Sequence, residues 1–208
     1  VRTTGTQSIG GLKTFTNDSA WIGGSSFIIN DAATATAALV RVPAPGGAGY
    51  DGPSVSTGAI KIKMPVATIN NNVMMSFDVK IYDYTANESL DMTITGYAYS
   101  AVNWNNQTVV THANQTSRDY TVRYGDDGTS HCVWIGELTS TWSHIKVGVF
   151  NFIGGHTVAE EEYGSGWDIT IVTAFDTVQD IKSNNLPVAR TATTLQTART
   201  IAGVSFNG

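Results

Sequence analysis

Hydrophobic and polar residues alternate along three successive stretches of this chain. In residues 59–64, isoleucine or methionine occupies every second position and lysine separates them. The same alternation continues through residues 73–81 and 90–98. Because successive side chains of a strand point to opposite faces of a sheet, this pattern predicts three antiparallel strands, each with one buried face.

Further short apolar segments are bounded by clusters of Gly, Asn, Asp and Ser, which is typical of strands separated by turns. We predict strands at 107–111, 119–124, 130–135, 143–152 and 167–175. Residues 124–129 predict a hairpin connection, because Gly and Asp tolerate the positive φ that such turns require. The Pro- and Gly-rich residues 42–53 predict either a long surface loop or a hinge.

Many short strands without a helical period predict an all-β fold, namely an antiparallel β-sandwich that is jelly-roll-like. With 208 residues, of which 41% are hydrophobic, the chain can bury a sizeable core. We expect the β-sandwich domain at 25–183, between an N-terminal connector at 1–24 and a C-terminal connector at 184–208.

The composition narrows the choice of partners. Charged residues make up 14% of the chain, against about 25% in a typical domain, so the surface suits neutral ligands or burial between subunits. The net charge of -5 and the lack of a basic stripe argue against a nucleic-acid partner. No apolar run approaches the length of a membrane helix, so no membrane insertion is expected. Cys132 is the only cysteine, which excludes an intrachain disulfide.

The two ends carry the most distinctive motifs. Residues 195–208 read Leu-Gln-Thr-Ala-Arg-Thr-Ile-Ala-Gly-Val-Ser-Phe-Asn-Gly, and residues 5–15 read Gly-Thr-Gln-Ser-Ile-Gly-Gly-Leu-Lys-Thr-Phe. The first segment resembles a connector that recurs in tail fibres of tailed bacteriophages and prophages. The second resembles the Gln-x-Ile-x-Gly-x-Lys-Thr-Phe repeat of fibre shafts. Because the chain begins at Val1 and ends within the C-terminal motif, we expect it to be a segment of a longer polypeptide.

This resemblance implies a parallel homotrimer in the tail fibre of a virion, with other tail or baseplate proteins as partners. The isolated apolar residues of both ends cannot close a core within segments that are otherwise so polar. Residues of this kind are buried between subunits instead. The expected trimer contacts are Ile9, Leu12, Phe15, Leu195, Ile201, Val204 and Phe206.

A candidate ligand site lies near the middle of the chain. Trp104 stands in an Asn-rich segment that we expect to be a polar loop, where a large ring has little core to join. Side-chain amides beside a ring suit sugar hydroxyls, although the ring could instead cap the sandwich or contact a neighbouring subunit. Tyr97 and Tyr99 share one face of their strand, as a binding platform or a subunit contact. The ligand-binding candidates are Trp104, Asn103, Asn105, Asn106, Tyr97 and Tyr99, whereas Trp134, Trp142 and Trp167 are expected in the core.

No catalytic residue, metal site or cofactor is predicted. Three consecutive glutamates at 160–162 are typical of a solvated turn, and Asp78 and Asp91 lie on outward faces of neighbouring strands, where solvation explains them. The four histidines lack the spacing of metal ligands. The acidic residues of 126–128 could approach calcium, but a hairpin turn accounts for them.

The resulting prediction is a non-enzymatic receptor-binding adhesin of a phage tail fibre, which recognises a bacterial surface glycan or protein. A structural spacer knob of the fibre shaft, with the tip elsewhere, is the main alternative. A capsule or lipopolysaccharide depolymerase comes third and needs two carboxylates that converge in a groove. Cys132 shares a strand face with Trp134, so it is expected to be structural.

Overall fold

A computed structural model describes residues 19–22, 26–29, 39–65, 69, 72–84, 88–99, 103–114, 120–156, 163–182, 199–201 and 204–206. Strands account for nearly all of its regular structure, and they pair antiparallel, which confirms the all-β prediction. No helix in the described ranges is long and apolar enough to cross a lipid bilayer.

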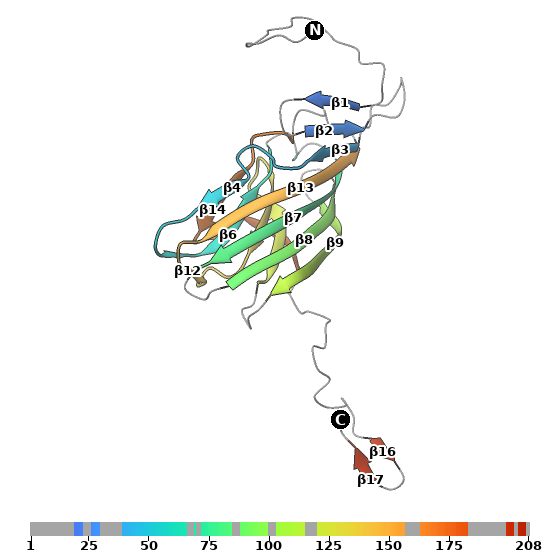
Figure 1. Ribbon diagram of the computed structural model, residues 1–208, viewed down its shortest axis with the longest axis vertical. Helices are drawn as coiled ribbons and strands as arrows, with labels where there is room; N and C mark the ends of the chain where they lie inside the picture. The colour runs from blue at the N-terminus through green and yellow to red at the C-terminus, as the bar shows by residue number, and fades with distance from the viewer. Residues whose placement is uncertain are drawn as a thin grey trace, which may run out of the picture.

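Among the described residues, the larger of the two main sheets has eight strands. They are β1 (Ser19–Ile22), β2 (Ser26–Ile29), β3 (Leu39–Val42), β4 (Gly49–Asp51), β7 (Val73–Asp83), β8 (Glu88–Tyr99), β9 (Asn103–Asn114) and β13 (Lys146–His156). Their order is β1-β2-β3-β13-β7-β8-β9, and β4 also pairs with β13. Figure 1 shows β13, β7, β8 and β9 side by side across the front of the molecule.

The second main sheet, with five strands in the described part of the chain, lies behind the first (Figure 1). It consists of β6 (Ala59–Lys63), β10 (Val122–Asp126), β11 (His131–Ile135), β14 (Asp168–Val172) and β15 (Thr177–Lys182). Their order is β14-β6-β11-β10-β15. Two small sheets pair β5 (Ser56–Thr57) with β12 (Thr141–Trp142), and β16 (Arg199–Ile201) with β17 (Val204–Phe206).

One apolar core lies between the two main sheets. Along β7, buried residues alternate with exposed or half-buried ones, as the sequence pattern predicts. The facing residues of both sheets belong to a single buried cluster, which includes Ile60, Ile62, Phe77, Val79 and Ile94. The opposite face of the larger sheet points away from this core, and we call it the outer face.

Two polar side chains tie the sheets together at one corner. The Trp104 indole of β9 donates a hydrogen bond to the Gly125 carbonyl of β10, at 3.0 Å. The Tyr124 hydroxyl of β10 lies 3.4 Å from the Thr95 carbonyl and 3.3 Å from the Thr108 carbonyl. These contacts fix β8 and β9 relative to the second sheet.

The strands predicted from alternation are present as β6, β7 and β8, and the predicted hairpin joins β10 to β11. The predicted strand at 107–111 is longer than expected, because β9 begins at Asn103. Residues 42–53 are neither a hinge nor loop throughout: Val42 ends β3 and Gly49–Asp51 form β4, which pairs with β13. The loop between these strands is held to the domain, since the Gly46 amide bonds the Gly164 carbonyl at 2.8 Å.

The terminal connectors are described only in part. β1 lies within the expected N-terminal connector, and its pairing with β2 joins it to the larger sheet. In the C-terminal motif, β16 and β17 form a hairpin in which Ile201 opposes Val204 and Arg199 opposes Phe206. The other expected trimer contacts, Ile9, Leu12, Phe15 and Leu195, lie outside the described residues.

Candidate functional site

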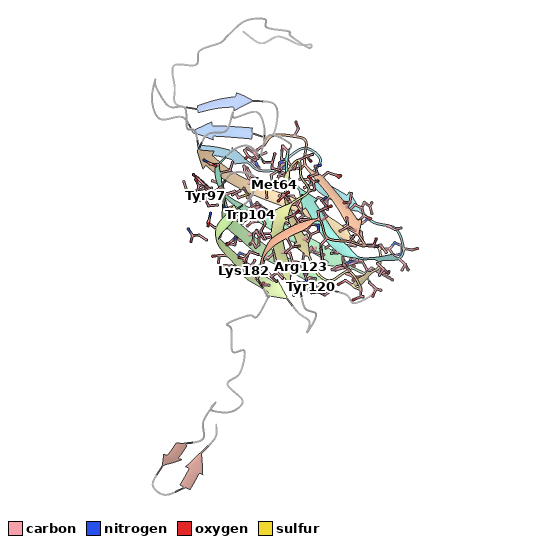
Figure 2. All side chains as sticks on the ribbon, turned by 180° about the vertical axis from the view of Figure 1, so that it is seen from behind. Met64, Tyr97, Trp104, Tyr120, Arg123 and Lys182 are labelled. Atoms are coloured by element: carbon pink, nitrogen blue, oxygen red, sulfur yellow. The ribbon has the colours of Figure 1, made fainter. Side chains whose placement is uncertain are left out.

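Trp104 is a core residue, so the expectation of an exposed ring in a polar loop is wrong. Its side chain is 7% exposed. It lies on β9 directly opposite Ala98 and contacts the rings of Tyr124 and His131, with centroid distances of 5.1 and 5.4 Å. In Figure 2 Trp104 lies over the body of the domain and Tyr97 toward its margin. The indole is therefore not free to stack on a ligand.

The reason for this burial is the alternation of a strand combined with small residues on its neighbour. Asn103 and Asn105 point outward and Trp104 inward, toward Gly96 and Ala98 of β8. A Cβ atom at Gly96 would lie 3.0 Å from Cε3 of the indole, a tight contact, so the glycine lets the ring pack closely against the backbone of β8. The two small residues opposite Trp104 were the signal in the sequence that could have revealed its burial.

The remaining candidates around Trp104 gather on the outer face. Tyr97 opposes Asn105, and Tyr99 opposes Asn103 in the ladder between β8 and β9. The two tyrosine rings lie 5.8 Å apart and are tilted by 56°. Tyr99 is 49% exposed, and both asparagines are exposed. The ladder of two rings that the sequence predicted is therefore present.

We call Tyr97, Tyr99, Asn103 and Asn105 the tyrosine patch. Asn106 is exposed beside it, at a bulge of β9 where its φ is 53°. The patch offers ring faces next to side-chain amides, which donate and accept hydrogen bonds. An arrangement of this kind can stack against the apolar face of a sugar while it bonds the hydroxyls.

A row of hydrogen-bonded polar side chains crosses the centre of the outer face. Asn151 of β13 donates to Asp78 of β7 at 3.0 Å, and Thr93 of β8 donates to the same carboxylate at 2.7 Å. Thr93 also lies 2.7 Å from Nε2 of His112 on β9. Partial burial opposes ionisation of Asp78, but the hydrogen bonds from Asn151 and Thr93 outweigh it, so its pKa lies below the ordinary value. We call these four residues the central polar row.

A shallow cleft of about 540 Å³ lies on the same face, over β13, β7 and β8. We call it the outer cleft. Two aromatic side chains in it are partly exposed, Tyr82 at 45% and Phe150 at 38%. Its other lining residues are Lys80, Ile81, Ser89, Leu90, Asp91, Lys146, Val147 and Gly148.

Lysines of the outer cleft are already paired with carboxylates of the protein. Lys80 binds Asp91 on the neighbouring strand, and Lys146 binds Asp51 of β4. Asp78 and Asp91 therefore have different hydrogen-bonding partners, Asn151 and Thr93 for the first and Lys80 for the second. The glutamates at 160–162 lie outside the described residues.

The acidic hairpin between β10 and β11 binds lysines. One oxygen of Asp127 accepts hydrogen bonds from the Thr129 and Ser130 amides, and its other oxygen lies 3.1 Å from Lys61 and 2.9 Å from Lys63. Burial opposes ionisation of Asp127, but these donors hold its pKa far below the ordinary value. Within the described ranges no three His, Cys, Asp or Glu side chains gather as a metal site.

Cys132 is fully buried on the outward side of the second sheet, in a small cluster with Ala59 and Trp134. Burial raises the pKa of its thiol to about 12, although Lys61 and Lys63 nearby act in the opposite direction. The pairing of β11 with β6 places those lysines beside it. The residues next to Cys132 in the sequence offered no sign of these two lysines.

No protein-family model, curated protein or solved structure matches the chain.

Proposed function

We propose that this chain is the receptor-binding part of a phage tail fibre and that its tyrosine patch binds a glycan of the bacterial surface. One observation carries the proposal: two tyrosine rings 5.8 Å apart stand beside two exposed asparagines on the outer face of a sheet. The resemblance of both chain ends to fibre connectors supports the tail-fibre setting. The proposal includes a jelly-roll-like sandwich assembled as a homotrimer.

The chemistry of the patch suits an uncharged sugar. Tyr97 and Tyr99 supply apolar surface with hydroxyl groups at its edge, and the two amides supply donors and acceptors. None of the four side chains is charged, so binding should depend little on salt. Three copies of the patch in a trimer would strengthen a weak contact through avidity.

Glycan-array binding by the full chain tests this proposal. The variant Tyr99→Ala should weaken glycan binding by roughly fivefold to tenfold, because it removes about 1 kcal/mol of ring contact. Tyr84→Ala is a matched control, since Tyr84 is 60% exposed and lies outside both the patch and the outer cleft. Equal glycan binding by Tyr99→Ala and Tyr84→Ala would exclude the tyrosine patch as the binding site. An array without any binding would favour the spacer alternative.

A further inference from the structure

We propose that the outer face binds one linear, neutral polysaccharide at two anchors, the tyrosine patch and the outer cleft, with the central polar row between them. This inference rests on the proposed function and extends it. It names the ligand as an extended chain of sugars rather than a single terminal sugar. The outer cleft is an observation that supports this inference independently of the tyrosine patch.

Phe150 is placed in the outer cleft as an exposed stacking surface. Its ring lies against Gly148, two positions earlier on β13, where an added Cβ would lie 2.7 Å from the ring. The glycine backbone therefore supports one side of the ring, while 38% of Phe150 remains exposed. Tyr82 adds a second exposed ring from β7, the strand that pairs with this part of β13. Exposed rings with such support are suited to the apolar face of a sugar.

The charges of the cleft favour a neutral partner. The ammonium group of Lys80 lies against the carboxylate of Asp91, so a donor and an acceptor stand side by side. Neighbouring sugar hydroxyls each donate and accept, and they can bond both groups without breaking the ion pair. An acidic sugar would have to compete with Asp91 for the lysine, on a protein of net charge -5.

The central polar row provides hydrogen-bonding groups along the path between the anchors. Asp78 is held in place by Asn151 and Thr93 from the two neighbouring strands. His112 extends the row to β9 through its contact with Thr93. These side chains are short or already held by hydrogen bonds, so they lose little conformational freedom when a ligand binds. Their polar atoms can therefore bond sugar hydroxyls along the path without rearrangement.

The distance between the anchors sets the length of the ligand. The cleft includes Asp91 near one end of β8, and the patch includes Tyr97 near the other end. Asp91 and Tyr97 are six positions apart along the strand, which corresponds to about 20 Å at the usual rise per residue. One or two sugar rings cannot bridge this gap. A chain of several rings that runs along β8 can occupy both anchors, and the second contact then becomes intramolecular.

The test measures how the affinity of the full chain depends on glycan length. The array carries linear neutral oligosaccharides from one ring to many, with acidic oligosaccharides of equal length beside them. Wild type should bind long neutral chains best. Phe150→Ala and Tyr82→Ala should each weaken binding of long chains by about tenfold and leave short oligosaccharides at the patch unaffected. Tyr99→Ala should weaken both, and Tyr84→Ala neither.

Several results would overturn the inference while the proposed function stands. Examples are equal affinity for short and long chains, preference for acidic chains, or unchanged long-chain binding by both cleft variants when Tyr99→Ala weakens it. If Phe150→Ala weakened the binding of short and long chains equally, the cleft would be the single binding site and two anchors would be excluded. If wild type binds no glycan, both proposals fail. Circular dichroism of each variant shows whether it is folded.

Discussion

The ion pairs of Asp127 give a quantitative prediction about stability. Asp127→Asn keeps an oxygen for the Thr129 and Ser130 amides but replaces the oxygen that faces Lys61 and Lys63 with an amide donor. These side chains are only 10–28% exposed, so solvent screens the lost attraction weakly. Loss of charge-assisted hydrogen bonds costs about 1.5–3 kcal/mol. For a chain of this size the Tm should fall by about 3–12 °C.

Denaturant and thermal unfolding at fixed protein concentration measure this loss, and Asp126→Asn is the matched control. Asp126 lies in the same turn, but the partners of its carboxylate among the described residues are neutral, namely the Gly128 amide and the Gln179 side chain. We therefore expect a clearly smaller effect from the control. Equal effects would show that the turn, and not the lysine pairs, accounts for the stability.

The pH dependence provides a second check on Asp127. Its pKa is lower in the folded than in the unfolded chain, where it lies near the ordinary value of 3.8. The stabilisation is therefore complete above that value and is lost as the pH falls toward the folded pKa. The difference between wild type and Asp127→Asn should be constant from neutral pH to about pH 5 and shrink in stronger acid. A difference that grows on acidification would refute the reasoning.

The remaining predictions concern two buried residues. Trp104→Ala should lower the free energy of unfolding by about 3–5 kcal/mol, as measured by denaturant titration, and Trp104→Phe should lower it less. A Trp104→Ala variant that is as stable as wild type but loses glycan binding would show that the ring contacts the ligand. Cys132 should react with a thiol reagent on the order of 100-fold more slowly in the folded than in the unfolded protein, because burial disfavours the thiolate. Cys132→Ala should cost about 1 kcal/mol and leave assembly intact; lost assembly would indicate an interchain role.

The sequence predicted most clearly those strands in which polar and apolar residues alternate. β6, β7 and β8 alternate apolar and polar residues, so both their location and their buried faces could be read from the pattern. The start of β9 was missed because consecutive asparagines resemble a loop, and only the small residues of β8 explain the buried tryptophan among them. β15 was also missed, since the burial along it is intermediate and lacks a clear alternation.

The candidate site was predictable only in part, because pairings between distant strands create it. The tyrosine ladder follows from spacing within one strand. By contrast, the central polar row joins Asp78 to Asn151, 73 positions apart, and the outer cleft draws residues from three strands. Such contacts depend on sheet order and register, which local patterns do not determine.

The hydrogen bonds that join the two sheets at Trp104 and Tyr124 bear on how the domain responds to mechanical load. If the two layers carried only apolar contacts, they could slide past one another with little change in buried area, because such contacts are not directional. The indole bond to Gly125 and the contacts of the Tyr124 hydroxyl with Thr95 and Thr108 are directional and lengthen as soon as sliding begins. Shear between the layers therefore meets directional resistance at this corner, which includes the two strands that carry the tyrosine patch.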